Sequence, residues 1–260
     1  VDQATDGTPA AVWCFDFHAI LLSRSLLDRL GFGADTPDPP GGRFERDHAG
    51  TPTGLLLESA AAIAWNRLTP AHTDRASTVA GLSDLARFFR EAHDLKAKPD
   101  LAAGLPSLLD EAGVDLRVEL FPLVGDLDAA LAGQPSDPRV RVAGGKIFVD
   151  GTLNSRTAWM LEPYADGPPE HPAGMALMKP AEIENAINKC ASLGLRLACH
   201  AIGDGAVRAV LDATERVRPP RWTVRIEHTE VIDAADAPRF TELDLQPRQL
   251  QQLQQQLLVD

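Results

Sequence analysis

The stretch LRLACHAIGDGAVRAVLDATERVRPPRWTVRIEH, residues 195–228, decides the fold class. Two β-rich apolar runs, 195–201 and 223–228, flank an amphipathic segment. This segment begins near Asp204, a residue suited to a helix N-cap, and ends before Pro219 and Pro220. A strand, a helix and a second strand in this order predict two parallel strands joined by a helical crossover.

The same rhythm extends on both sides of this stretch. Apolar runs at 116–123 and 140–149 predict two earlier strands. Helices are predicted over 180–193, with Pro180 in its first turn and Gly194 as its stop, and over 233–243. The second half of the chain therefore predicts an α/β fold with a parallel sheet.

The first half of the chain is less regular. Residues 11–16 predict a strand, residues from Ala19 to a stop at Gly31 predict a helix, and residues 55–94 predict a long helical stretch with a break near Thr69 and Pro70. We interpret residues 1–245 as one domain with a Gly- and Pro-rich excursion at 33–54, and residues 246–260 as a Gln-rich, helical tail. A long irregular loop is expected over 150–178, and such loops are often functional.

Composition excludes some classes of function. The chain has 260 residues, is 44% hydrophobic and has a net charge of −12, which argues against a nucleic-acid partner. No apolar run is long enough to cross a membrane. Three cysteines without Cys-x-x-Cys spacing and no visible secretory leader favour reduced thiols and a cytoplasmic location. The sequence is also compatible with assembly of the chain into a homo-oligomer.

Three residues at predicted strand ends carry candidate chemistry: Lys146, His200 and His228. The ends of parallel strands converge on one face, and imidazole is a good ligand for zinc and similar ions. A lysine ligand would have to be neutral or carbamylated by carbon dioxide. Each residue also has an ordinary structural interpretation, such as a hydrogen-bonded histidine. The spacing of these residues alone predicts an α/β enzyme and does not decide whether it uses a metal.

Three segments around these residues, GGKIFVDGTLNSRTA (144–158), ACHAIGDGAV (198–207) and RIEHTE (225–230), resemble the amidohydrolase superfamily. The resemblance is to the amidohydrolase family 3 group of YtcJ-like metal-dependent hydrolases. AVWCFDFHAILLSRSLLDRLG (11–31) and GGRFERDHAGTPTGLLLESA (41–60) resemble upstream segments of the same group, and the similarity covers most of residues 8–243.

The resemblance implies a TIM-like (β/α) barrel and a metal site. Lys146 would be the carbamylated lysine of the fourth strand, and His200 and His228 would be the ligands on the fifth and sixth strands. One or two divalent ions, zinc by expectation, would polarise an amide carbonyl and activate a water. His18, Asp150 and Arg156 fall in matching motifs and would contact the substrate or the ligands. Glu227 and Asp204 would orient the ligands.

The sequence also departs from the family. It contains no His-x-His pair, which the first strand of the family supplies, and no aspartate in the context of the eighth strand. Phe17 stands where the family usually has glycine. EAHDLKAKPDLAAG (91–104) is interpreted as helix and loop, so a strand of the family is expected to be missing. These departures predict an incomplete or distorted barrel, in which either both ends of the full-length domain are lacking or the ligands have been lost with the activity.

Two functions follow as hypotheses. The first is a metal-dependent hydrolase that uses activated water on carbon–nitrogen bonds of small-molecule amides other than peptides. The second is a non-catalytic amidohydrolase-like protein or inactive fragment with a binding or regulatory role. An α/β enzyme without metal is a third alternative, which the order of the motifs disfavours.

Overall fold

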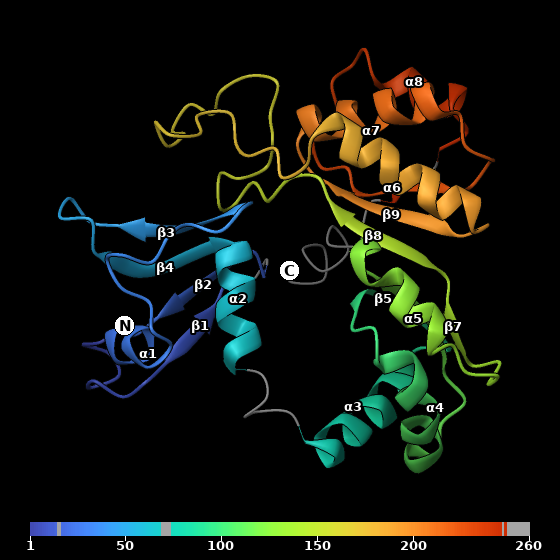
Figure 1. Ribbon diagram of the computed structural model, residues 1–260, viewed down its shortest axis with the longest axis horizontal. Coiled ribbons are helices and arrows are strands. Elements are labelled where there is room, and N and C mark those ends of the chain that lie inside the picture. Colours follow the sequence, from blue (N-terminus) through green and yellow to red (C-terminus); the bar gives the residue numbers. More distant parts are fainter. Residues whose placement is uncertain (15–16, 69–73, 246, 249–260) are drawn as a thin grey trace, which may run out of the picture. The chain divides into compact units, whose positions relative to one another are not determined.

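The computed structural model describes residues 1–14, 17–68, 74–245 and 247–248. The chain divides into two compact units, which are coloured along the sequence in Figure 1. Unit 1 comprises Val1–His72 and Asp150–Leu177, and unit 2 comprises Thr73–Val149 and Met178–Asp260. The long loop predicted at 150–178 therefore folds with the N-terminal unit.

Unit 1 is built on an antiparallel sheet with the strand order β1-β2-β4-β3. Its elements are β1 (Ala11–Trp13), β2 (Ala19–Leu22), α1 (Arg24–Arg29), β3 (Gly42–Arg46), β4 (Pro52–Glu58) and α2 (Ser59–Leu68). Ile20, Leu27, Phe44 and Leu56 are fully or almost fully buried in its core, together with alanines of α2. The predicted excursion at 33–54 supplies β3 and the start of β4, so it is part of this sheet.

Unit 2 contains the parallel strands. Its elements are α3 (Arg75–Phe88), β5 (Glu91–Ala97), α4 (Leu101–Ala112), β6 (Arg117–Pro122), the 3-10 turn η2 (Val124–Asp126), α5 (Leu127–Ala132), β7 (Val140–Val142), β8 (Gly144–Phe148), α6 (Pro180–Ser192), β9 (Arg196–Ala201), α7 (Asp204–Val217), β10 (Val224–His228), α8 (Ala237–Glu242) and β11 (Pro247–Arg248). The strands form two parallel sheets, β5-β6-β7 and β8-β9-β10-β11, with neighbours in chain order.

The two parallel sheets are joined at the junction of β7 and β8. Ala143 lies between these strands; its N–H donates to Leu120 O at 2.9 Å, and its carbonyl accepts from Arg196 N at 3.2 Å. A further parallel bridge pairs Leu123 with Lys146. Parallel strands in sequential order with helical crossovers are the topology of a (β/α) barrel. The described strands form an open part of such a barrel and do not close it.

Helices cover one face of this sheet. Figure 1 shows α6, α7 and α8 gathered on one side of β8 and β9. Helix α6 packs on β8 and β9, and α7 packs on β9 and β10. Pro180 occupies the first turn of α6, as predicted, and the Glu182 carboxylate accepts a hydrogen bond of 2.6 Å from Lys179 N. The N-cap of α7 is Gly203, one residue before the predicted Asp204.

Two helix predictions for the first half are wrong. The predicted helix from Ala19 is the strand β2 followed by the short helix α1, because the run AILL pairs with both β1 and β4. The predicted helical stretch 55–94 contains parts of β4 and β5 as well as α2 and α3. Short apolar runs do not distinguish a helix from a strand by periodicity alone.

The strand expected to be missing is present as β5. Its charged side chains interrupt the apolar run that would predict a strand. In the structure, partners of these side chains lie on the neighbouring strand β6. Glu91 forms an ion pair of 3.2 Å with Arg117, and His93 lies 3.2 Å from Glu119 Oε2. Ion pairs across adjacent strands satisfy these polar groups within the sheet.

The Gln-rich tail lies mostly outside the described residues, so its predicted helix is not tested; within it, Pro247–Arg248 form β11, parallel to β10. In the described part of the chain, no helix has the length and apolar character needed to cross a membrane. Within the described residues, no disulfide bond joins any of Cys14, Cys190 and Cys199.

Candidate functional site

Two glycines at the start of β8 identify the faces of the parallel sheet. A Cβ atom placed on Gly145 would lie 3.1 Å from Cys190 Sγ of α6, whereas a Cβ atom on Gly144 would lie 2.7 Å from Phe121 Cε1. Successive side chains of a strand point to opposite faces. Lys146 therefore points to the same face as Gly144 and Phe121, away from α6. We call this the inner face.

Lys146 is buried on the inner face, with 2% of its surface exposed. It lies in register opposite Ala198 of β9, whose small side chain leaves room beside it. Its Nζ atom is 4.8 Å from the centre of the Phe148 ring. Moving an ammonium group from water to such a place is costly, so a lysine here points to a specific use of its amine.

His200 and His228 lie at the ends of β9 and β10, and their ring centres are 4.6 Å apart. Register places His228 opposite Ala201, a position whose side chain would normally point to the other face from His200. However, the backbone of His228 is left-handed, with φ of +71°, and that of Thr229 follows with φ of +52°. This conformation costs on the order of 1 kcal/mol per residue. We infer that it turns the imidazole of His228 toward His200.

Phe148 connects the lysine to the histidines. It lies opposite His200 in the register of β8 and β9, and the two ring centres are 5.1 Å apart. Lys146, His200 and His228 therefore form one contiguous group around Phe148 at the carboxyl ends of three neighbouring strands. The structure brings these three predicted residues together, while their role as metal ligands stays a prediction.

The donor chemistry of this group fits a divalent cation. Two imidazoles in ring contact can each offer a nitrogen, as zinc prefers. A buried lysine supplies oxygen ligands once it is carbamylated. Zinc or a similar ion is therefore compatible with these residues.

A buried ion pair lies next to the histidines on the inner face. Glu227 is in register with His200, and Arg225 is in register with Ala198. The Arg225 Nε atom donates to the Glu227 carboxylate, and its Nη1 atom donates to His93 Nδ1 at 3.3 Å. Arg225 therefore contacts both Glu227, which is in register with His200, and His93 of β5.

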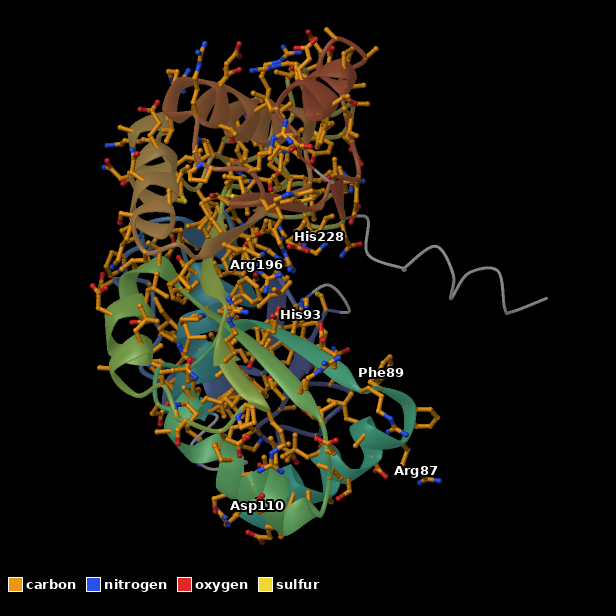
Figure 2. All side chains as sticks on the ribbon, turned by 90° about the vertical axis from the view of Figure 1, so that its right-hand side faces the viewer. Arg87, Phe89, His93, Asp110, Arg196 and His228 are labelled. Atoms are coloured by element: carbon orange, nitrogen blue, oxygen red, sulfur yellow. The ribbon has the colours of Figure 1, made fainter. Side chains whose placement is uncertain are left out.

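His93 also belongs to a second group with metal-binding geometry. Ligand atoms of Glu91, His93 and Glu119 all lie within 4.8 Å of one another. Arg196 also donates a hydrogen bond to the Glu119 carboxylate. His93, Arg196 and His228 are labelled in Figure 2. Because Arg225 can only donate to Nδ1, a neutral His93 carries its hydrogen on Nε2 and donates it to the carboxylates. This protonation favours an ion-pair network over a metal site.

The three residues predicted to contact the substrate, His18, Asp150 and Arg156, belong to unit 1. His18 Nδ1 is 2.7 Å from Glu58 Oε2. Asp150 is fully buried, and its Oδ2 atom accepts a hydrogen bond of 3.0 Å from Trp159 N. Arg156 forms an ion pair of 2.8 Å with Asp166, and this hydrogen bond raises the pKa of the guanidinium. The structure therefore gives Asp150 and Arg156 clear local roles in ordering the loop 150–177.

A cavity of about 450 Å³ lies beside β8 in unit 2. Lys146 and Phe148 line it together with Glu182 and Lys189 of α6, and with Val124 of η2. Pockets for small molecules are typically of this size. Because η2 and α6 form much of its lining, the cavity lies on the α6 side of β8, opposite to the inner face that carries the candidate group.

Glu58, His93 and Arg225 were not among the site residues predicted from the sequence. The alternation in EAHDLKA was the available signal for His93, but it was interpreted as helix. Glu58 was only quoted as part of a motif. Arg225 and Glu227 are spaced two apart in a predicted strand, which indicates a common face.

Comparisons with known proteins agree with these motifs. The model of the amidohydrolase family matches residues 1–249. YtcJ of Bacillus subtilis (strain 168), described as an amidohydrolase, is 32% identical over 256 residues, which are 88% of this chain and 46% of that protein. The N-substituted formamide deformylase of Arthrobacter pascens is 28% identical over 266 residues, which are 94% of this chain and 48% of the relative.

A solved structure is similar as well. A metal-dependent hydrolase from Pyrococcus furiosus matches with a TM-score of 0.64 and 26% sequence identity, over 91% of this chain and 49% of that chain. The chain thus spans about half the length of the relatives that it matches.

Proposed function

The chain belongs to the amidohydrolase family, and we propose that it contributes the metal-binding half of a hydrolase that cleaves carbon–nitrogen bonds other than peptide bonds. The observation that carries this proposal is the contiguous group of Lys146, His200 and His228 on the inner face of the sheet. In a (β/α) barrel, the carboxyl ends of the strands form the active site.

In this proposal the three residues hold one or two divalent ions, with zinc as the expected metal. The ion, when bound, supplies Lewis-acid chemistry and activates water. His200 and His228 must offer unprotonated nitrogens to it. The ion pair of Arg225 and Glu227, two residues apart on β10, would fix the Glu227 side chain beside the ligands, because it is buried on the same face.

The proposed substrates are small amides. The support for this class is the deformylase relative, which acts, by its name, on N-substituted formamides. We further propose that His18, Asp150 and Arg156 contribute to substrate contacts. Among these, the imidazole of His18 lies against the carboxylate of Glu58, with Nδ1 2.7 Å from Oε2.

A combined metal and activity assay tests the proposal. The purified chain is loaded with zinc and desalted, its metal content is measured by mass spectrometry, and formate release is followed with a panel of N-alkylformamides. His200→Ala and His228→Ala should each remove most of the bound zinc and lower turnover by at least about 10-fold.

The exposed histidine of unit 1 provides the control. His48→Ala removes an imidazole in the same way but from the surface, and it should leave both readouts unchanged. If the zinc content is the same in all four proteins, the assignment of His200 and His228 as ligands is wrong.

One observation favours a non-catalytic role as the second candidate. The sequence has no His-x-His pair, so within the described residues only one lysine and two histidines form the candidate group. A chain that binds zinc but releases no formate, under conditions in which the Arthrobacter deformylase does, would support the binding or regulatory alternative.

A further inference from the structure

A second lysine, Lys96, reaches the group that contains the candidate ligands. It lies one residue before the carboxyl end of β5, and its Nζ atom is 5.4 Å from the centre of the Phe148 ring. Lys146 Nζ and the His200 ring centre lie 4.8 Å and 5.1 Å from the same point. All four residues belong to unit 2. Phe148 therefore has two lysine side chains and an imidazole next to its ring.

A β-bulge in β5 accounts for the direction of Lys96. In the pairing of β5 with β6, β5 has one residue more than its partner between Asp94 and Ala97. Leu95 packs against the inner-face cluster that contains Phe121, so strict alternation would direct Lys96 to the opposite face. The extra residue breaks this alternation, and bulges next to active sites commonly re-aim a side chain in this way. The Asp94 carboxylate accepts a hydrogen bond of 3.0 Å from Lys96 N, which holds the local turn.

The two lysines beside Phe148 differ in their surroundings. Lys146 is buried, whereas Lys96 is exposed, so solutes reach its ammonium group. The face of the Phe148 ring attracts this cation and keeps it near the candidate ligands. An ammonium group has three N–H donors, so an anionic ligand can bind to it in addition to the contacts that Lys96 makes within the chain.

The charges on the inner face also favour an anion. The carboxylates of Glu119 and Glu227 each accept hydrogen bonds from an arginine, Arg196 and Arg225 respectively. These pairs offset the negative charges that would otherwise repel an anionic ligand. The chain as a whole has a net charge of −12, so the ammonium of Lys96 is a local exception to an acidic molecule.

We propose that Lys96 is a specificity-determining residue that selects small amides with an anionic group, such as a carboxylate, a few bonds away from the amide. Anion binding by Lys96 follows from the geometry of unit 2, whereas the amide rests on the proposed hydrolase function. Lys96 Nζ and the His200 ring centre both lie within 5.4 Å of the Phe148 ring centre, so one small molecule reaches both groups. Lysine binds such an anion as a point charge with a charge-assisted hydrogen bond.

Nuclear magnetic resonance tests anion binding without turnover. The metal-free chain with ¹³C-labelled lysine, assigned with Lys96→Met, is titrated with N-formyl-β-alanine and with its neutral amide. The carboxylate should shift the Lys96 Cε signal in a saturable way, and its Kd should rise about 10-fold in Lys96→Met. The neutral amide should shift the signal much less. A carboxylate that leaves the Lys96 signal unchanged, or binds equally well to Lys96→Met, would overturn the proposal.

Kinetics test the selection of substrates. The quantity to compare is the ratio of kcat/KM for N-formyl-β-alanine to kcat/KM for its neutral amide, measured with the zinc-loaded chain. Lys96→Met should lower this ratio about 10-fold, mainly through KM, and Lys96→Glu should lower it further because it repels the carboxylate. The matched control is Lys98→Met, which removes an exposed lysine two residues further along the chain and should leave the ratio as in the wild type.

The possible failures are distinguishable. An active enzyme with the same ratio in the wild type and in Lys96→Met would refute the role of Lys96 and leave the proposed function intact. An equal fall of the ratio in Lys98→Met would show a general effect of charge and would also contradict the proposal. A wild type that hydrolyses neither compound would sink the proposed function, and the titration would still decide whether Lys96 binds the anion.

Discussion

Lys146 shows what can be learned from a single side chain. Its position in an apolar strand was visible in the sequence, and the structure buries it on the inner face beside Ala198. A residue that is retained at a cost to stability is typical of a functional site. His228 is also retained at a cost to stability, because its backbone has a left-handed φ of +71°. The motif RIEH does not predict this conformation.

Replacing Lys146 with methionine should abolish metal binding without lowering the free energy of unfolding. Lys146→Met keeps an unbranched side chain of similar length and removes the amine that would be carbamylated, so it should abolish zinc binding. The free energy of unfolding should stay equal or rise by on the order of 1 kcal/mol, since a buried charge is replaced by an apolar group. Urea unfolding and metal analysis measure the two effects. A loss of more than 2 kcal/mol would instead assign Lys146 to a structural ion pair.

The residues found only in the structure share one property: they are polar and act through partners far away in sequence. His93 and Arg225 are 3.3 Å apart, and Glu58 reaches both His18 and Thr157. Periodicity in a sequence indicates which residues share a face of a helix or strand. It does not indicate which residues far apart in the sequence form a polar contact. The candidate ligands were found because each lies in a motif of its own at a strand end.

At the scale of elements, the parallel strands and their helices were predicted well, because long runs such as 195–217 have clear periodicity. The N-terminal half was predicted poorly. Strands β2 and β5 were interpreted as helix, since the first is a short apolar run and the second is rich in charge. In both cases pairing with neighbouring strands overrides local preference.

The loop 150–177 is fastened to β3 by a polar contact that should depend on pH. His171 lies beside Arg43, which also pairs with Glu170 at 3.3 Å and with Glu45 at 3.0 Å. Burial, and then the charge of Arg43, lower the pKa of His171 below its ordinary value of 6.5, whereas Glu45 and Glu170 act in the opposite direction.

The sign of the effect follows from proton binding. Between the lowered pKa of the folded protein and 6.5, the unfolded chain binds more protons at His171, so stability falls as pH decreases through this range. Unfolding by urea at pH 7 and pH 5 should therefore show a smaller loss for His171→Gln than for the wild type. Equal losses would mean that His171 is not buried as described.

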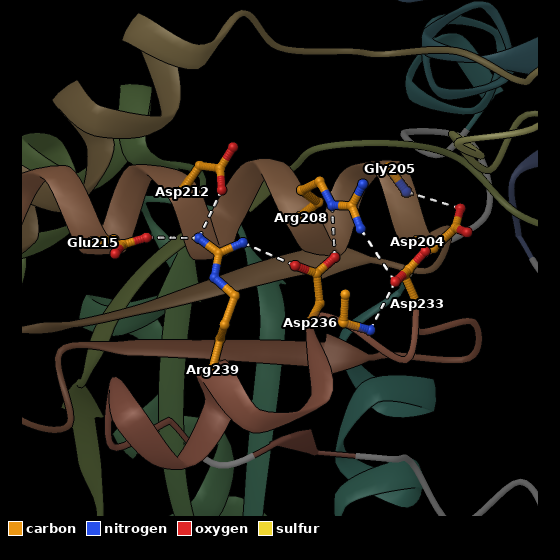
Figure 3. A network of polar contacts seen from close by, with 9 residues as sticks. Asp204, Gly205, Arg208, Asp212, Glu215, Asp233, Asp236 and Arg239 are labelled. Atoms are coloured by element: carbon orange, nitrogen blue, oxygen red, sulfur yellow. Dashed lines mark hydrogen bonds and ion pairs between the residues drawn. The ribbon is translucent and has the colours of Figure 1, made fainter.

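Helix α8 and the segment before it are fastened to α7 by a network that Figure 3 shows. Asp236, with 4% of its side chain exposed, accepts from Arg208 Nε at 2.7 Å and from Arg239 Nη1 at 2.9 Å. The hydrogen bond to Asp236 raises the pKa of Arg208. Arg239 also pairs with Asp212 and Glu215 of α7.

Asp236→Asn should destabilise unit 2, because it leaves two guanidinium groups with a weaker acceptor. We expect a loss of about 2 kcal/mol in the free energy of unfolding, measured by urea titration. The matched control is Asp84→Asn, which weakens the exposed ion pair with Arg87 and should cost less than about 0.5 kcal/mol. Similar losses in both variants would refute a special role for the buried network.

At the scale of the whole molecule, the chain combines an open parallel sheet in unit 2 with a small antiparallel unit that also takes up the loop after β8. The resemblance predicted the barrel topology, and the described strands follow its order without closing it. The division into two units was not visible in the sequence, because the loop 150–177 joins unit 1 through contacts such as Thr157–Glu58 and not through local pattern.

The central claim is that Lys146, His200 and His228 bind a common cation, and anomalous X-ray scattering from a crystal soaked in zinc tests it most directly. The account predicts a strong peak about 2.0–2.1 Å from a nitrogen of both His200 and His228, with density for a carbamate on Lys146 next to it. No zinc at this position, or a peak only among Glu91, His93 and Glu119, would contradict the account.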